Sequence, residues 1–542
     1  MRQRSLFLLL LGVTLWASGM SLAVPNLVHD GDRWVCLGDS ITAMNCYPPV
    51  LERVFKHYHP EANFTVINSG VGGDVASDDP QKLTNRVLKY NPTIVSIMYG
   101  MNEAINIWHL GQPKAPVQEN YRKCLTYMVR TLRAKHITVL LMSPTLTDPS
   151  CHSFFVLEQT IPFLKECAQI MREVAQAEGA HYVPVQEDLE AFALAQPAGV
   201  AMTADGVHPA ALGQYRMARS LWEYCGFAGP MNVTSKRKTR PTPALPVTAA
   251  LASRFVQTNA TGVALTLTAD KPLTVTASWS IGDLHKQETL KLVAGANSWN
   301  VPVPADHLPA RNGQNSSLLV DLRAGEADTL YFIDLCRTQV LHLVDNRVSG
   351  TVDSDTDGKR LATWQVQRLG ESLFFNCEVI DAEINPEGFW PFGRDGLNLM
   401  FDFRPTARFA DLGIDREVYQ AFLNVREQPS FAVGLRAWTG QGLDFASTVG
   451  GARTPTGYTV QLFIHDNFNP LTPVKLSTRD FVGLLVAVDD LAVVNKAPKM
   501  TITTNQRNDY PVNVAANNLM ILDLKNKLPG EQIINAHLFA AR

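Results

Sequence analysis

Residues 33–226 alternate short apolar runs rich in β-branched residues with longer amphipathic stretches. The runs 33–37, 64–67, 93–99, 137–142 and 181–185 predict strands, and the stretches 49–57, 117–133, 158–178 and 212–224 predict helices. Strands that alternate with helices form a parallel sheet covered on both faces. Such sheets bind ligands beyond the carboxyl ends of their strands, so the loops at those ends are where a functional site is expected.

The pattern changes after residue 226. Residues 231–246 mix basic residues with three prolines and predict a linker between domains, although the basic run alone would also fit a polyanion-binding patch. Alternating apolar and polar residues then predict strands at 263–268, 273–279, 318–322, 373–380, 397–403, 459–464 and 482–488. We expect an α/β domain at 24–230, a small β-sandwich at 247–335 and a larger one at 340–542.

The N-terminus has the pattern of an export signal. Arg2 and Arg4 precede the apolar run 6–16, and small residues lead to a cleavage site expected after Ala23. The alternative is a membrane anchor, for which the apolar run is short. Residues 1–23 are therefore predicted to be a signal peptide, which places the mature chain outside the cell or in the periplasm. We expect no stable membrane span.

Charge and cysteine content exclude other classes. The chain has 48 basic and 51 acidic residues and a net charge of −3, so nucleic acid is not an expected partner. Eight cysteines without a CxxC pair do not predict a zinc site. An exported chain can form disulfides, but Cys36 and Cys377 lie in apolar runs and are expected to be buried thiols.

The first candidate for chemistry is Ser40, in a Gly-Asp-Ser sequence directly after the first predicted strand. A serine at such a strand-to-helix junction can present its hydroxyl above the sheet edge, and Gly38 permits the tight turn. The alternative is that Ser40 only caps the next helix. A triplet of this kind is by itself a weak signal.

A general base for Ser40 is found near the last predicted helix. Asp205 and His208 lie three residues apart on one loop. His208 can accept the serine proton, and Asp205 can orient the imidazole and stabilise its charged form. The alternative is a polar turn with an exposed histidine.

Donors for a developing oxyanion are expected after the second and third strands. The glycine-rich segment 68–74 offers backbone N–H groups, and it lacks the spacing of a phosphate or dinucleotide loop. Asn102, in the segment 99–103, can donate from its side-chain amide, or it can be a turn residue.

The order Gly-Asp-Ser, Gly, Gly-x-Asn, Asp-x-x-His over residues 33–226 resembles the SGNH (GDSL-type) hydrolase family. The resemblance implies a three-layer, flavodoxin-like α/β domain. It implies a catalytic triad of Ser40, Asp205 and His208, and an oxyanion hole formed by the N–H groups of Ser40 and Gly73 and the Asn102 amide. Gly73 is favoured over Gly70 because the family's glycine directly precedes an acidic or polar residue. Glu103 departs from the family, in which many members have Asp.

The mechanism expected from these residues is ester hydrolysis through an acyl-enzyme, with no cofactor and no metal required. Loss of one oxyanion donor should lower the rate by about 10²–10³-fold. The rate should fall at a pH below about 6.5, the ordinary range of a histidine base.

The larger predicted sandwich resembles family 9-like carbohydrate-binding modules. The resemblance rests on a succession of four features: the strand 374–381, Trp390, the Asp-Gly strand 394–402 and the strand 457–464. Trp364, Trp390 and Trp438 are candidate sugar platforms, although most tryptophans in a sandwich belong to the core. Residues 353–358 resemble the start of a calcium loop, but the twelfth position is Trp364 instead of Glu, which excludes an EF-hand. A structural calcium of another kind and a polar turn are both left open.

An exported esterase joined to such a module suggests removal of acetyl or other small acyl groups from a polysaccharide, so an acylated carbohydrate polymer or oligosaccharide is the expected partner. Trp108, His109 and His152 are candidates to line the pocket. Two alternatives stay open: a lipid or aryl esterase with the same triad, and a non-catalytic glycan-binding surface protein.

Overall fold

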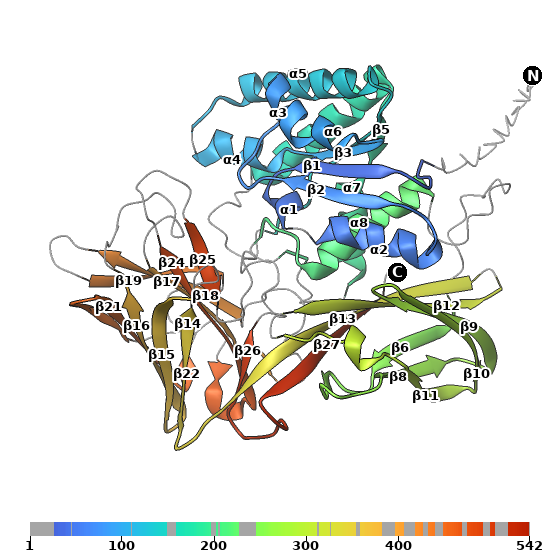
Figure 1. Cartoon of the computed structure of the whole chain (residues 1–542). Helices are drawn as coiled ribbons and strands as arrows, with labels where there is room; N and C mark the ends of the chain where they lie inside the picture. Colours follow the sequence, from blue (N-terminus) through green and yellow to red (C-terminus); the bar gives the residue numbers. More distant parts are fainter. Residues whose placement is uncertain are drawn as a thin grey trace, which may run out of the picture.

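The computed structural model describes residues 27–44, 46–109, 111–148, 159–196, 202–203, 206–226, 245–311, 314–325, 327–353, 358–381, 396–405, 418–426, 432–439, 448–468, 474–490, 499–503 and 519–540. A five-stranded parallel sheet in the order β2-β1-β3-β4-β5 forms the centre of its first part (Figure 1). The strands are β1 (Arg33–Gly38), β2 (Thr65–Gly70), β3 (Ile94–Met98), β4 (Thr138–Met142) and β5 (His181–Val183). This confirms the predicted parallel sheet.

Helices cover both faces of this sheet, with α4, α5 and α6 on one side and α2, α7 and α8 on the other (Figure 1). The described helices are α1 (Ser40–Ala43), α2 (Tyr47–Tyr58), α3 (Pro80–Arg86), α4 (Met101–His109), α5 (Lys114–Arg133), α6 (Thr160–Glu178), α7 (Val185–Ala195) and α8 (Ala211–Cys225). The domain thus has the three layers of the predicted α/β fold.

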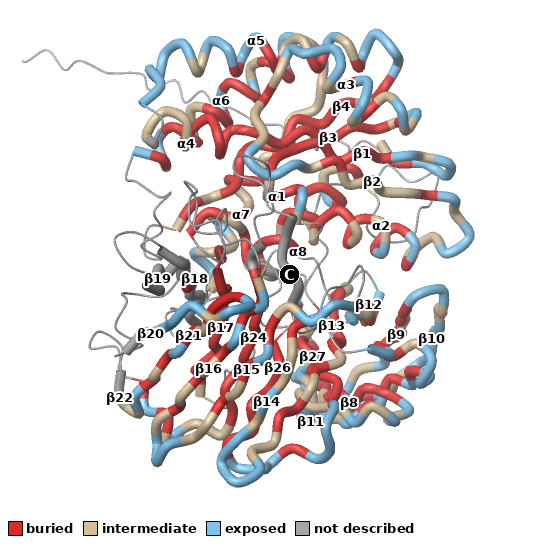
Figure 2. The backbone as a smooth tube through the Cα atoms, turned by 60° about the vertical axis from the view of Figure 1, so that its left-hand side comes forward, coloured by how far each residue is buried: buried red, intermediate tan, exposed pale blue. Residues whose placement is uncertain are grey.

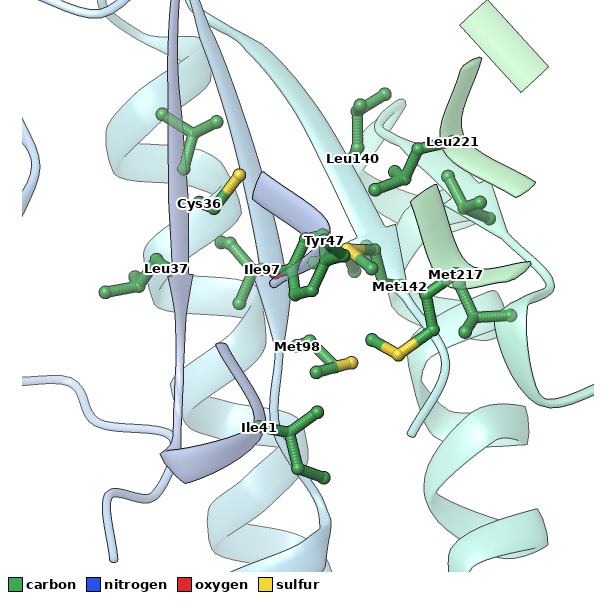
Figure 3. Packing of buried hydrophobic residues seen from close by; sticks show 14 of the residues in the cluster. Cys36, Leu37, Ile41, Tyr47, Ile97, Met98, Leu140, Met142, Met217 and Leu221 are labelled. Atoms are coloured by element: carbon green, nitrogen blue, oxygen red, sulfur yellow. The ribbon is translucent and has the colours of Figure 1, made fainter. Parts of the chain in front are cut away.

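The core of the α/β domain lies between the sheet and these helices. Strands β1 and β3 are buried almost from end to end, which explains why they read as continuous apolar runs. Figure 3 shows Leu37 and Ile97 of these strands, with Met217 and Leu221 of α8 packed in the same cluster. This close packing fixes the carboxyl end of β1, from which Ser40 follows.

The second part of the chain is made of strands. They are β6 (Val247–Leu251), β7 (Phe255–Val256), β8 (Val263–Ala269), β9 (Leu273–Ile281), β10 (Leu284–Leu292), β11 (Gly295–Val301), β12 (Asn315–Ala324), β13 (Ala327–His342), β14 (Arg347–Asp353), β15 (Arg360–Leu369) and β16 (Ser372–Ile380). They continue with β17 (Gly396–Asp402), β18 (Val418–Arg426), β19 (Ala432–Thr439), β20 (Thr448–Thr454), β21 (Gly457–Ile464), β22 (Asn467–Phe468), β23 (Val474–Lys475), β24 (Phe481–Asp490), β25 (Lys499–Thr503), β26 (Met520–Asp523) and β27 (Gln532–Ala540).

These strands form two sandwiches joined by one long sheet. In the first, the sheet β11-β8-β6 faces β9, β12, β13 and β27 across a shared core. In the second, the sheet β14-β15-β16-β21-β20 faces β17, β24 and β26. Strand β13 pairs with β12 and β27 and, at its end, with β26, so the predicted boundary between residues 335 and 340 falls within a strand.

The α/β domain packs directly on the first sandwich. Figures 1 and 2 show α2 and α8 above β12, β13 and β27. The rings of Tyr215 on α8 and Phe332 on β13 have centroids 4.7 Å apart, and Phe539 on β27 lies 4.8 Å from Tyr215. Phe332 and Phe539 belong to the same buried cluster as the core of the α/β domain.

Polar contacts border this apolar interface. Arg53 on α2 donates to Ser317 at 2.5 Å, and Tyr215 donates to Asp334. His57 Nδ1 lies 2.7 Å from Ser280 Oγ on β9. Burial, helped by His285 and Arg323, lowers the pKa of His57 to about 3, so this side chain is neutral in the interface.

Several predictions fall outside the described residues. These are the signal peptide 1–23 and the linker 231–246, apart from its last two residues. In the part of the chain that the structure describes, no helix combines the length and apolar character that a membrane crossing requires. The described cysteines are free thiols, and Cys36 and Cys377 are buried as predicted.

Candidate active site

Ser40 is the first residue of α1, directly beyond the carboxyl end of β1. Asp39 is the N-cap of this helix and accepts a hydrogen bond from Ile41 N–H at 2.9 Å. The alternative in which Ser40 only caps the helix is therefore wrong, since Asp39 has that position. Gly38 is required here, because a Cβ would lie 2.2 Å from Thr42 Oγ1 and 2.9 Å from the Met98 carbonyl oxygen.

The loop before α8 brings His208 to Ser40. His208 Nε2 lies 2.9 Å from Ser40 Oγ, across 168 residues of sequence. A β-bridge between Thr203 and Pro209 closes this loop at its base. Asp148 N–H also donates to the Gly206 carbonyl at 2.8 Å, which ties the loop to the segment that follows β4. Asp205, the predicted partner of His208, lies outside the described residues.

The two remaining predicted donors lie on neighbouring loops. Gly73 has a φ of +74° in the loop after β2, a conformation that favours glycine. No hydrogen-bond acceptor for the Gly73 N–H is found among the described residues, whereas the Gly70 N–H already donates to Asn68 Oδ1 at 2.8 Å. Asn102 lies in the first turn of α4, and its Nδ2 donates to the Asp74 carbonyl at 2.9 Å. Gly73 and Asn102 are thus held together through Asp74.

The α/β domain is similar to known proteins. Residues 36–216 match the model of the GDSL-like Lipase/Acylhydrolase family. Residues 36–216 form a GDSL-like ester hydrolase domain. An acetylxylan esterase from Geobacillus stearothermophilus is 22% identical over 218 residues, which are 37% of this chain and 96% of that protein.

Two solved structures are also similar to the GDSL-like domain. One is an alpha/beta hydrolase from the metagenome of Lake Arreo, Spain, with 22% identity and a TM-score of 0.33, covering 38% of this chain and 99% of that chain. The other is a mutant of an acetyl-xylooligosaccharide esterase from Geobacillus stearothermophilus, with 19% identity and a TM-score of 0.33, covering 39% of this chain and 99% of that chain.

Glu103, which departs from the family pattern, connects two loops of the GDSL-like domain. Its Oε1 accepts from Ala76 N–H at 2.8 Å and its Oε2 from Gly100 N–H at 2.9 Å. The side chain is buried, and burial raises its pKa to about 7. Burial likewise raises the pKa of Asp39 to about 7. The longer glutamate therefore joins the loop that follows Gly73 to the loop that precedes Asn102.

This pKa predicts a pH dependence of stability. Because the folded-state pKa of Glu103 lies above its ordinary value of 4.5, the folded protein binds more protons than the unfolded chain between about pH 4.5 and 7. Its contribution to the free energy of unfolding is therefore present in full below pH 4.5 and is lost as the pH rises towards 7, at up to about 1.4 kcal/mol per pH unit. Urea unfolding of wild type and Glu103→Gln at several pH values measures this contribution. A difference between the two proteins that is constant with pH would contradict it.

Sequence reasoning missed the groups that support Gly73 and Asn102. Asp74 interacts with Lys82, Arg86 and Tyr99. Two features of the sequence could have indicated these contacts. An acidic residue directly follows Gly73, and the Asp-Pro sequence at Asp79 predicts the start of α3, which carries Lys82 and Arg86.

The remaining candidates are the residues expected to line the pocket or to bind sugar. The Trp108 ring packs edge-on against Phe163, with ring centroids 5.4 Å apart. Trp364 as a sugar platform is wrong, because it is buried in the core of the second sandwich. The side chains of four further candidates lie outside the described residues: His109, His152, Trp390 and Trp438.

The predicted calcium loop is only partly described. Asp353 accepts a hydrogen bond from Arg360 Nε at 2.5 Å, and residues 354–357 lie outside the described residues. Among the described side chains, no group of three or more His, Cys, Asp or Glu residues is arranged to hold a metal ion.

Proposed function

We propose that this protein is an exported serine esterase that removes acetyl or other small acyl groups from a polysaccharide. The observation that carries the proposal is the 2.9 Å separation of His208 Nε2 from Ser40 Oγ at the carboxyl end of β1. A hydroxyl at this distance from an imidazole nitrogen can lose its proton as it attacks. The proposed reaction requires neither a metal nor a cofactor.

The reaction proceeds in two halves. Ser40 Oγ attacks the ester carbonyl while His208 Nε2 takes its proton, and the tetrahedral oxyanion accepts hydrogen bonds from Ser40 N–H, Gly73 N–H and Asn102 Nδ2. His208 then returns the proton to the leaving sugar oxygen, which gives the acyl-enzyme. Water attacks this ester with His208 again as base, and the carboxylic acid is released. Asp205 would hold the imidazole in the required orientation.

Two findings favour a carbohydrate ester as substrate. The relative that matches over 96% of its own length is named an acetylxylan esterase. The GDSL-like domain also packs on a strand-rich region, and a binding module joined to an enzyme would raise the effective concentration of polymer near Ser40. A polymer-bound acetyl group is therefore a better candidate than a lipid or aryl ester.

Acetate release from acetylated xylan tests the proposal, with p-nitrophenyl acetate run in parallel and chemically deacetylated xylan as the control polymer. We expect acetate from the acetylated polymer and hydrolysis of the small ester. Hydrolysis of the small ester alone would favour a lipid or aryl esterase. If the protein hydrolysed neither substrate but bound xylan, the glycan-binding alternative would be favoured.

A further inference from the structure

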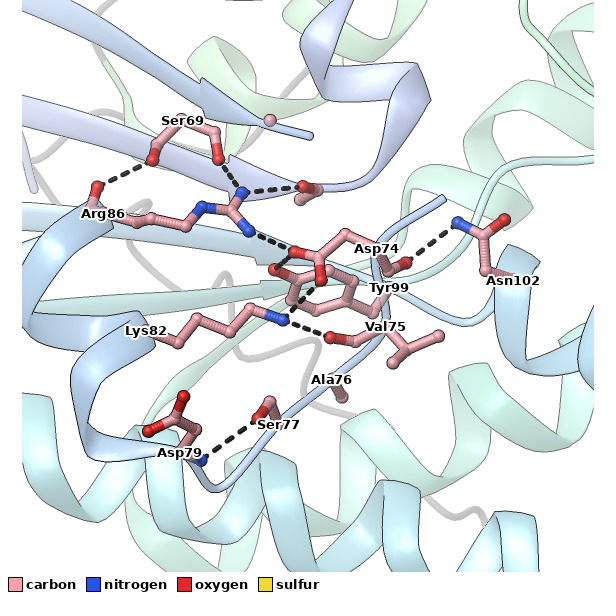
Figure 4. Close-up of polar contacts among 12 residues, drawn as sticks. Ser69, Asp74, Val75, Ala76, Ser77, Asp79, Lys82, Arg86, Tyr99 and Asn102 are labelled. Carbon is pink, nitrogen blue, oxygen red and sulfur yellow. Dashed lines mark hydrogen bonds and ion pairs between the residues drawn. The ribbon is translucent and has the colours of Figure 1, made fainter. Parts of the chain in front are cut away.

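Asp74 lies directly after Gly73, and its carboxylate is held by three side chains (Figure 4). Lys82 Nζ donates to Oδ1 at 2.7 Å, and Tyr99 Oη donates to Oδ2 at 2.9 Å. Arg86 Nη1 also donates to Oδ2. Lys82 and Arg86 are four residues apart on α3, so both reach the carboxylate from one face of that helix.

The main chain of Asp74 holds Asn102. The Asp74 carbonyl accepts from Asn102 Nδ2 at 2.9 Å. A side-chain amide has two N–H groups, so this bond fixes the plane of the amide and leaves the second N–H for another acceptor. One residue therefore sets the position of Gly73 through the chain and the orientation of Asn102 through a hydrogen bond.

Arg86 connects this arrangement to the strand that carries Ser40. Its Nη2 donates to the Gly38 carbonyl at 3.3 Å and also to the Ser69 carbonyl. Ser69 Oγ in turn donates to the Arg86 carbonyl at 2.7 Å. The ends of β1 and β2 and the loop after β2 are thereby fixed to one guanidinium group.

The positive charges of Lys82 and Arg86 stabilise the ionised Asp74 carboxylate. Burial alone would raise the pKa of Asp74, but its bonds with Lys82 and Arg86 outweigh burial and hold the pKa below the ordinary value. The Asp74 carboxylate therefore stays ionised at neutral pH. Charge-assisted hydrogen bonds of this kind are shorter and stronger than neutral ones.

We propose that Asp74 is a positioning residue that preorganises the oxyanion hole, through its carboxylate bonds to Lys82, Arg86 and Tyr99 and its carbonyl bond to Asn102. The inference rests on the proposed function. Donors that are fixed before reaction stabilise the transition state without reorganisation, whereas they add little to the binding of the neutral ester. Disturbing Asp74 should therefore lower kcat and leave KM nearly unchanged.

The test compares Asp74→Asn with Asp78→Asn in the full-length protein. Asp78 is a matched control, because it lies on the same loop and pairs with Lys123 at 2.7 Å but is exposed. For Asp74→Asn we expect kcat for p-nitrophenyl acetate to fall by about 10–100-fold, less than the about 10²–10³-fold expected for Asn102→Ala. Asp78→Asn should keep the wild-type kcat.

Two further readouts separate positioning from general damage. A boronic acid forms a tetrahedral anion on a serine, so its inhibition constant should rise by about the factor by which kcat falls in Asp74→Asn. The pH dependence of kcat should keep its midpoint, since His208 is unchanged. Tyr99→Phe, which removes a single bond to the carboxylate, should show a smaller fall in kcat in the same direction.

Three outcomes would overturn the inference. One is a wild-type kcat in Asp74→Asn together with a lowered kcat in Asn102→Ala. In that case the proposed function would stand, but Asp74 would have no positioning role. Another is a loss that appears in KM, or only in the fraction of folded protein measured by thermal unfolding. If wild type hydrolyses no ester, the proposed function fails first, and the inference fails with it.

Discussion

Ser40→Ala is expected to lower kcat for p-nitrophenyl acetate and for acetylated xylan by about 10⁶-fold, since removal of a catalytic serine has an effect of that size in serine hydrolases. The variant lacks the nucleophile but keeps Asp39 as helix cap, so the fold should be retained. Residual catalysis over water should remain, because the oxyanion donors are still in place. Rates measured with wild type and variant at equal concentrations of folded protein check the expectation.

A second serine of the same domain provides the control for this experiment. Ser220 on α8 donates to the Arg216 carbonyl one turn before it at 3.1 Å, and neither residue belongs to the proposed catalytic site. Ser220→Ala should therefore keep the wild-type kcat. If Ser40→Ala retained most of the activity, the nucleophile would have to be another residue, and the contact between Ser40 and His208 would be structural.

Phe332→Ala is expected to lower the free energy of unfolding by about 3–5 kcal/mol, the usual effect of removing a large buried aromatic side chain. Phe332 lies on β13 but is fully buried against the α/β domain, where it contacts Tyr215 and Trp222. The substitution therefore removes packing from both domains at once. Because α8 follows the His208 loop directly, ester hydrolysis should be lost at a lower urea concentration than in wild type.

Urea unfolding followed in parallel by fluorescence and by residual activity measures this effect. Val344→Ala is the control, because Val344 is 71% exposed and its truncation should change stability by less than about 0.5 kcal/mol. A fall in the stability of the strand-rich part alone, with the activity transition unchanged, would show that the two domains are merely tethered.

Much of the α/β domain could be predicted from sequence because its central strands β1, β3 and β4 are buried on both faces. Such strands read as continuous apolar runs. The less buried edge strands β2 and β5 also lie at predicted runs, so all five predicted runs lie at observed strands. The proximity of Ser40 and His208 followed from the rule that candidate residues gather at the carboxyl ends of parallel strands.

The surroundings of Asn102 were harder to predict. No helix was predicted between the strand at 93–99 and residue 117, but the chain turns at Gly100, with φ of +127°, and α4 begins at Met101. The spacing of Met101, Ala104 and Trp108 is typical of a helix face and could have indicated it. The position of Asp74 after Gly73 was visible in the sequence, but its contacts were not, because its three partners lie on α3 and directly after β3.

Contacts between segments that are distant in the sequence also could not be predicted from local sequence patterns. Trp364 alternates with polar neighbours in the same way whether its side chain faces the core or solvent, so its burial depends on which face of the sheet is covered. The aromatic contact between α8 and β13 likewise depends on the packing of two domains, and sequence periodicity describes each domain by itself.

Strand β27 closes the first sandwich by pairing with β13 and with β7, which precede it in the chain by almost the whole second sandwich. A ribosome therefore releases β6 to β13 long before the strand that completes their sheet has been synthesised. During that time the edge of β13 that β27 will occupy is open to other strands. Completion of the first sandwich and of the Phe539 contact with α8 is accordingly a late step in folding, because both need a strand that is synthesised after the second sandwich.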